Sequence, residues 1–195
     1  PVGRAIAWYA GLAVLAFGTL SGLAVYGRAS FSMHMTQHMT LSMIAPLLLV
    51  LGAPITLALR GLSAARSAQP AGPREWLLAG LRSPFARVLT HPVTALLLFI
   101  SAPFMVYFSG LFETAMRAHW AHELMHVHFV LVGYLFYESL IGTDPIPYRA
   151  AYPMRMVTLF AALSFHAFFA VALMSSDALI AGSYFETLDR PWWPD

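Results

Sequence analysis

The chain has 195 residues, of which 59% are hydrophobic and only 10% are charged, whereas a soluble domain is about 45–50% apolar and about 25% charged. Eleven arginines and nine acidic residues cannot cover the surface of a globule of this size, so a water-soluble protein is excluded. Lysine is absent, the arginines are scattered and the formal net charge is +2, which argues against a nucleic-acid partner.

The first half of the chain contains two long apolar segments and a basic connector. Residues 5–27 carry no charge and are long enough to cross a hydrocarbon core of about 30 Å as a helix. Residues 33–59 are predicted as a second span, with kinks near Pro46 and Pro54. Residues 60–90 hold five arginines and one acidic residue, and we expect their second half to form a short amphipathic helix at the membrane interface.

Three further spans are predicted over residues 91–112, 119–141 and 153–175. A turn with two prolines separates the last two of these spans. The predicted fold class is therefore all-α, a polytopic membrane bundle of five transmembrane helices that forms a single domain over residues 1–195. The chain is expected to be a fragment of a longer protein, truncated at both ends.

The arginines predict the orientation of the bundle. Eight of the eleven lie at the start of the first span, in the connector or around the turn after the fourth span, and these regions share one side by parity. Short cytoplasmic loops accumulate positive residues, so this side is predicted to be cytoplasmic. The protein would then be a multi-pass protein of the bacterial plasma membrane.

Histidine is unusually abundant for so apolar a chain. Ionisable side chains are costly inside a membrane, which favours a functional role for them. His34 and His38 are four residues apart at the outer start of the second span, and such a pair shares one helical face. Six histidines on three spans are expected at similar depth on the extracytoplasmic side, and they are His34, His38, His119, His122, His126 and His166.

These histidines, with nearby methionines, predict a metal site. The chain has no cysteine, and imidazole combined with thioether favours copper, with methionine suited to Cu(I). Met35 and Met39 beside the first pair are included as candidate ligands, and zinc is a less favoured metal. His166 is equally compatible with a hydrogen bond between helices, whereas His91 is expected to start a helix and His128 to pack.

One competing motif is explicit in the sequence. His122, Glu123 and His126 form HExxH, in which two histidines bind zinc and the glutamate acts as general base. A catalytic zinc needs a third protein ligand, and Asp144 lies at the opposite end of the same predicted helix. A haem b electron carrier is a further alternative, although one haem on the outer side provides no route across the membrane.

Three blocks in this order carry a family resemblance: YGRASFSMHMTQHMTLSMIAPLLLVLGAPITLALRGL at 26–62, HELMHVHFVLVGYLFYESLIGTDPIPYR at 122–149 and FHAFFAVALM at 165–174. Together they resemble the CtaG family of cytochrome c oxidase assembly factors. The actinobacterial members, which are often fused to a copper-resistance membrane domain, are particularly similar. The resemblance implies about seven membrane helices, two of them after residue 195, and copper handling for the oxidase.

The hypothesis from the sequence is therefore a non-enzymatic assembly factor that binds copper from the outer face. Its partners would be an oxidase subunit or other assembly factors, with a fused or adjacent copper-transport domain as a further possibility. An intramembrane zinc metalloprotease and a metal-free assembly scaffold remain open as alternatives. The candidate metal ligands are His34, His38, His119, His122, His126, His166, Met35 and Met39.

Overall fold

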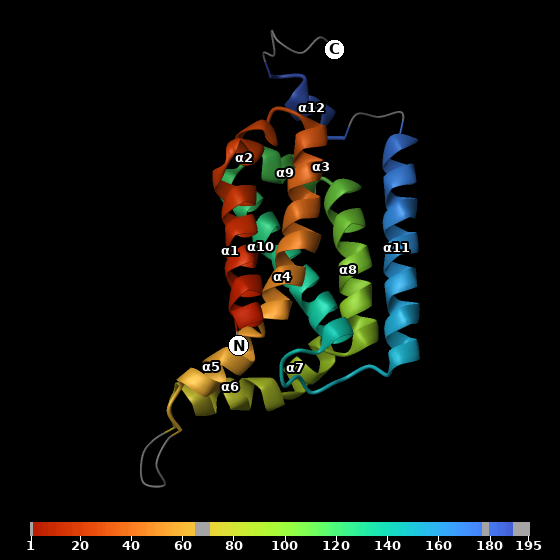
Figure 1. Ribbon diagram of the computed structural model, residues 1–195. Coiled ribbons are helices and arrows are strands. Elements are labelled where there is room, and N and C mark those ends of the chain that lie inside the picture. The colour runs from red at the N-terminus through yellow and green to blue at the C-terminus, as the bar shows by residue number, and fades with distance from the viewer. Residues whose placement is uncertain (1, 65–70, 177–179, 189–195) are drawn as a thin grey trace.

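The computed structural model describes residues 2–64, 71–176 and 180–188, and the regular structure in these ranges is entirely helical (Figure 1). Four helices are long and apolar enough to cross a membrane: α1 (Val2–Leu20), the segment Phe31–Gly61, α10 (His119–Ile141) and α11 (Tyr152–Met174). A fifth span results if the bent pair α8 (Pro92–Tyr107) and α9 (Leu111–Arg117) is counted as one. The predicted helical membrane bundle is confirmed.

The last two spans follow their predicted bounds closely. α10 occupies residues 119–141, as expected, and ends at Gly142, whose φ of 61° is a left-handed conformation that glycine adopts without strain. α11 begins and ends one residue before the predicted span. A largely apolar segment without proline, followed by a glycine, therefore predicts the bounds of α10.

The first and third predicted spans are shorter in the structure. α1 ends at Leu20, and the Ser21 side chain accepts a hydrogen bond from the Leu23 amide to start the separate helix α2 (Gly22–Tyr26). The third predicted span, residues 91–112, is interrupted in the structure, because α8 ends at Tyr107 and the chain turns by 68° into α9. The Ser109 hydroxyl accepts from the Leu111 amide, a local bond that competes with helix continuation.

The second span is divided by its prolines into α3 (Phe31–Met39), the π-helix η1 (Thr40–Ile44), α4 (Ala45–Gly52) and α5 (Pro54–Gly61). Pro46 cannot donate a backbone hydrogen bond, and the turn before it widens so that the Ala45 amide bonds to the Thr40 carbonyl. Gly133 of α10 packs against the Ser42 carbonyl so closely that a Cβ there would overlap the oxygen. The kink expected near Pro46 is thus a π-turn covered by α10.

The second break, before Pro54, is held by a buried carboxylate. Ala53 adopts a left-handed conformation with φ 52°, and the first two amides of α5 donate to Asp144, Ile55 N to Oδ2 at 3.1 Å and Thr56 N to Oδ1 at 2.7 Å. The Asp144 amide in turn donates to Glu138 Oε1 at 2.9 Å. This carboxylate network, Glu138 and Asp144, joins α5 to the end of α10.

The basic connector contains two short helices, α6 (Pro73–Arg82) and α7 (Pro84–Leu89), where one was expected. Ser83 takes an extended conformation before Pro84 and its hydroxyl caps α7, as the steric restriction before proline requires. Residues 65–70 of the connector lie outside the described residues.

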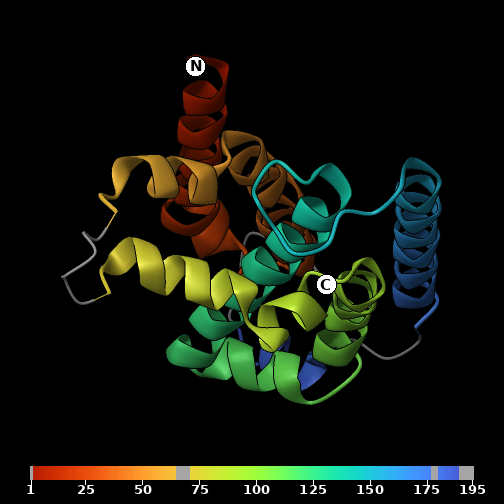
Figure 2. The same ribbon diagram turned by 90° about the horizontal axis from the view of Figure 1, so that it is seen from below.

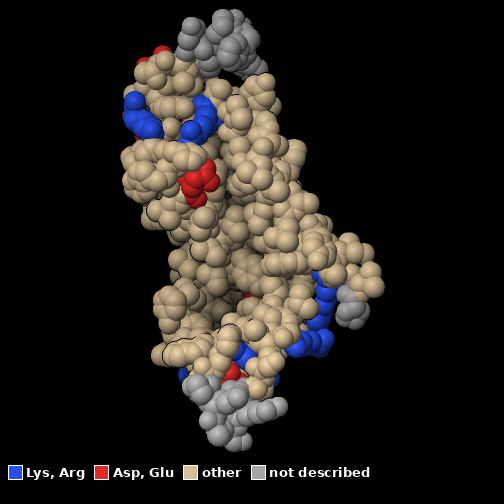
Figure 3. Space-filling model, turned by 90° about the vertical axis from the view of Figure 1, so that its left-hand side faces the viewer, with Lys and Arg blue, Asp and Glu red and all other residues tan. Residues whose placement is uncertain are grey.

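α10 is the central helix of the bundle and contacts α4, η1, α8 and α9. α1 packs against α4 on one side, and α11 packs mainly against α8 on the other (Figure 2). The space-filling view shows arginines gathered at the two ends and a broad middle band almost free of charge (Figure 3). The connector and the turn after α10 lie at one end, and the starts of α3 and α10 lie at the other (Figure 1). We call these the arginine end and the histidine end.

Candidate metal centre

Four of the predicted histidines are buried together at the histidine end. His34 and His38 lie on α3, and His122 and His126 lie on α10, with between 1% and 6% of each residue exposed. The rings of His34 and His122 are 5.8 Å apart between centroids, and those of His122 and His126 are 4.2 Å apart. The two spans thus bring their histidine pairs together at the same end of the bundle.

Packing of α3 places its two histidines. Gln37 lies between them and donates from Nε2 to the Gly18 carbonyl of α1 at 2.8 Å, which fixes the rotation of α3 against α1. His34 Nε2 is 2.9 Å from the hydroxyl of Tyr107 on α8. The His38 ring packs edge-on against Phe129 of α10 with centroids 4.2 Å apart. Both imidazoles are therefore held by neighbours from other helices.

Most nitrogens of this buried group have no hydrogen-bond partner. A neutral imidazole carries one donor and one acceptor, and buried polar atoms are normally paired because an unpaired one costs about 1–3 kcal/mol. Only His34 Nε2 has a partner within the described part of the chain, and seven buried nitrogens on the four rings have none: Nδ1 of His34 and both ring nitrogens of His38, His122 and His126. A bound cation would satisfy such lone pairs.

Glu123 completes a group with metal-ligand geometry. One of its carboxylate oxygens is 3.9 Å from His122 Nδ1, and the other is 3.8 Å from His126 Nδ1. Among the residues the structure describes, His122, Glu123 and His126 are the group of three whose ligand atoms all lie within 4.8 Å of one another. Two ligands on one tetrahedral ion at 2.0–2.1 Å are separated by about 3.4 Å, so small side-chain rotations would bring these atoms onto one ion.

The remaining predicted ligands lie around this group or apart from it. His119 is exposed, with Nδ1 3.1 Å from Arg28 Nη2 and 4.0 Å from Glu123 Oε1. His166 is partly buried on α11, where its ring lies against Phe99 with centroids 4.9 Å apart. Met35 and Met39 are partly buried on α3, and Met35 packs against the hydrophobic core. The structure thus gathers His34, His38, His122 and His126 and leaves His119 at the surface.

His91 and His128 are separate from the cluster. The His91 side chain accepts from the Val93 amide at 3.3 Å and caps α8, which confirms its interpretation as a helix-start residue. His128 lies on another face of α10 and borders a pocket between α8, α9 and α10.

Charged and polar side chains from three elements contact one another at the histidine end. Arg28 follows α2 and reaches His119, while the Tyr184 hydroxyl of α12 (Gly182–Phe185) donates to the Arg28 carbonyl at 3.2 Å. Glu113 and Arg117 of α9 form an ion pair at 3.0 Å, and both contact Ser183 of α12. α12 is therefore tied across the histidine end by polar contacts.

Sequence reasoning missed three residues of this site. Tyr107 and Arg28 were not considered, because each approaches the histidines only through the packing of distant segments. Glu123 was considered only as a general base, although the adjacent HExxH histidines were a signal that its carboxylate could lie beside them.

The family described as cytochrome c oxidase caa3 assembly factor (Caa3_CtaG) matches residues 1–195, and this match gives no support for the expected fused or adjacent copper-transport domain. Proteins named as uncharacterized from Mycobacterium leprae, Mycobacterium bovis and Mycobacterium tuberculosis are each 50% identical over 192 residues. The match covers 98% of this chain but 29% of each relative. No solved structure matches.

Proposed function

This chain belongs to the family of cytochrome c oxidase caa3 assembly factors, and from that premise we propose that it serves oxidase assembly by binding a copper ion at His122, Glu123 and His126. His34 on α3 would add a fourth nitrogen to this set. The role is proposed as non-catalytic, since a carrier needs only to bind the ion and release it.

The observation that carries the proposal is the set of unpartnered imidazole nitrogens. Seven such atoms within one buried cluster are costly unless another group satisfies them. A histidine cluster that only joined helices would pair its nitrogens across the interface, yet the rings of His122 and His126 make no hydrogen bond within the part of the chain that the structure describes. The cluster is therefore better suited to a ligand than to helix packing.

The chemistry of the donors supports copper. Two imidazoles and one carboxylate accept copper, zinc or iron, and the copper complex is the most stable of the divalent series. Copper handling for the oxidase is also what the family resemblance implies. Met35 and Met39 lie on the same helix as His34, and thioether ligands would favour Cu(I) over harder ions.

The position of Glu123 supports release as well as binding. Its side chain is 51% exposed, whereas those of His122 and His126 are 3% and 7% exposed. An ion would therefore meet the carboxylate first on entry and lose it last on departure. We place this opening on the extracytoplasmic side, because the arginine end would face the cytoplasm, and we propose an oxidase subunit as the recipient.

A zinc metalloprotease is the second candidate, favoured by the HExxH geometry itself. In that chemistry the glutamate is a base and a third protein ligand holds the zinc. Here the carboxylate lies beside both imidazoles as a potential ligand. Glu123→Gln distinguishes the two roles: a protease would keep its metal and lose turnover, whereas the copper carrier would lose affinity for the metal.

The proposal is tested by oxidase assembly in cells that express the full-length protein. We expect the double variant His122→Ala/His126→Ala to lose assembled oxidase when copper is limiting and to recover it when copper is supplied in excess. His91→Ala, which removes a histidine at the other end of the bundle, is the matched control and should assemble normally. Assembly by the double variant equal to that of the wild type at limiting copper would refute the proposal.

A further inference from the structure

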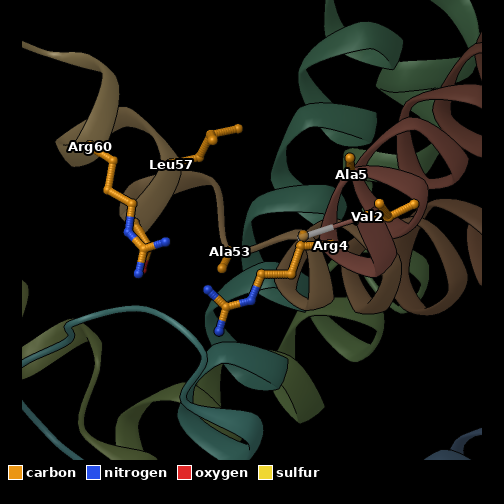
Figure 4. Close-up of a pocket in the computed structure, with 8 residues that line it drawn as sticks. Val2, Arg4, Ala5, Ala53, Leu57 and Arg60 are labelled. Carbon is orange, nitrogen blue, oxygen red and sulfur yellow. The ribbon is translucent and has the colours of Figure 1, made fainter.

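A pocket of about 290 Å³ opens at the arginine end, between the start of α1 and the junction of α4 with α5. Its walls are formed by small and apolar side chains, among them Val2, Ala5 and Leu57. Figure 4 shows the side chains of Arg4 and Arg60 extending from opposite sides toward the same opening. The pocket thus combines an apolar wall with two guanidinium groups at its mouth.

The pocket follows from the break in the second span. α1 and α4 pack closely, and a Cβ on Gly52 would lie 2.9 Å from the Trp8 Cβ. The chain then turns through left-handed Ala53, and α5 departs from the bundle below α1 (Figure 1). Because the Asp144 carboxylate caps the first amides of α5, the wedge between α1 and α5 is a fixed feature of the fold.

Neither arginine at the mouth has an ion-pair partner among the residues that the structure describes. Within the described ranges, neither Arg4 nor Arg60 forms a hydrogen bond or an ion pair, whereas Arg74, Arg149 and Arg155 at the same end all donate to backbone carbonyls. Two cations that face one cavity repel each other unless an anion lies between them. Guanidinium groups bind phosphate oxygens through paired hydrogen bonds.

The depth of the pocket indicates where such a phosphate would come from. Before the break at Ala53, α3, η1 and α4 cover residues 31–52, about 33 Å as a helix, which already matches a hydrocarbon core of about 30 Å. α5 follows this segment at its far end, so we infer that it lies at the level of the lipid headgroups. A ligand at this level can place a phosphate between the arginines and an acyl chain along the apolar wall.

We propose that this pocket binds one anionic phospholipid, with its phosphate between Arg4 and Arg60 and its acyl chain against Val2, Ala5 and Leu57. The site is independent of the copper proposal, because it lies at the opposite end of the bundle. The chemistry recognised is a phosphate group on a lipid, and free phosphate would lack the contact with the apolar wall.

The test is native mass spectrometry of the full-length protein from detergent with equal amounts of phosphatidylglycerol and phosphatidylcholine. The wild type is expected to retain phosphatidylglycerol selectively. Each arginine beside an anionic headgroup contributes about fivefold to affinity, so Arg60→Gln should weaken retention about fivefold and Arg4→Gln/Arg60→Gln about 25-fold. Arg82→Gln/Arg87→Gln is the matched control, since it removes the same charge from α6 and α7 outside the pocket.

Three results would overturn the proposal. The first is equal retention of phosphatidylglycerol by the wild type and by Arg4→Gln/Arg60→Gln. The second is an equal loss in the control variant, which would show general attraction to the arginine end rather than a site. The third is protection against thermal unfolding by inorganic phosphate alone, in phosphatidylcholine nanodiscs, that matches the protection by phosphatidylglycerol, because the ligand would then be a free anion. Both arginines are exposed, so these variants are expected to fold.

Discussion

A buried polar cluster lies at each end of α10, and the two clusters differ in how their polar atoms are paired. At the arginine end, Glu138 and Asp144 are almost fully buried, yet their carboxylates accept hydrogen bonds from three backbone amides. At the histidine end, His122 and His126 are similarly buried, and within the described residues their ring nitrogens have no hydrogen-bond partner, with Glu123 3.8–3.9 Å from each Nδ1. Pairing of this kind indicates a structural role for the carboxylates, and its lack indicates a ligand site at the histidines.

The comparison is tested most strongly by adding copper to the metal-free full-length protein. A ligand that binds only the folded state stabilises it by about 2.7 kcal/mol at a hundredfold excess over its Kd. We expect a clear rise in Tm for the wild type and no rise for His122→Ala/His126→Ala. An equal rise in that variant would place the copper elsewhere, and His91→Ala should behave as the wild type.

Removal of the Asp144 carboxylate at the arginine end should lower stability and leave copper binding unchanged. Asp144→Ala leaves the Ile55 and Thr56 amides without their acceptor, so the free energy of unfolding should fall by about 1–3 kcal/mol. Copper bound per folded molecule should not change. The check is thermal unfolding in detergent with metal content measured on the same sample; loss of copper from a folded Asp144→Ala variant would mean that the two clusters are coupled.

A smaller effect is expected when the carboxylate at the opening is neutralised. Glu123→Gln keeps the size of the side chain but replaces an anionic ligand by an amide, and we expect the copper Kd to rise by about 10- to 100-fold. Competition with a copper chelator of known affinity measures this change. An unchanged Kd would remove Glu123 from the ligand set, and Glu113→Gln, an acidic residue outside the group, is the control.

The smallest effect should follow from Tyr107→Phe. This variant deletes the hydroxyl that lies 2.9 Å from His34 Nε2 and leaves the aromatic packing in place. We expect a loss of stability of about 1 kcal/mol and a change in copper Kd of up to about tenfold, because a ligand held by a hydrogen bond is oriented for its metal. Chelator competition measures the copper Kd, and thermal unfolding measures the stability. If neither the Kd nor the stability changed, Tyr107 would not be part of the site.

The sequence predicted the bounds of a helix correctly where an apolar segment ends at a helix-terminating residue. α10 has an apolar run that ends at Gly142, and its bounds match the prediction. The bend after Tyr107 and the π-turn before Pro46 were not predicted in detail, because they depend on side-chain capping by Ser109 and on the close approach of Gly133. Hydropathy indicates whether a segment lies in lipid or in water. It carries no information about side-chain capping or the close approach of two helices.

The candidate site was predictable to the same extent. The i,i+4 spacing of His34 with His38 and of His122 with His126 fixes which helical face each pair occupies, and the bundle brings the two faces together. The spacing of the histidines did not predict that His119 is exposed. His119 is the first residue of α10, and its exposure depends on which segments pack over that end of the helix. Tyr107 comes from a helix 73 residues away from His34, and such a contact has no local signal.

The central claim, that the unpartnered histidines of α3 and α10 hold a copper ion, is tested most directly by elemental analysis. The full-length protein would be purified in mild detergent after supply of copper, zinc and iron, beside its His34→Ala/His38→Ala/His122→Ala/His126→Ala and His91→Ala variants. We predict about one copper per chain in the wild type and in His91→Ala, and none in the fourfold variant. Zinc or iron in place of copper, no metal in the wild type, or copper retained by the fourfold variant would contradict the claim.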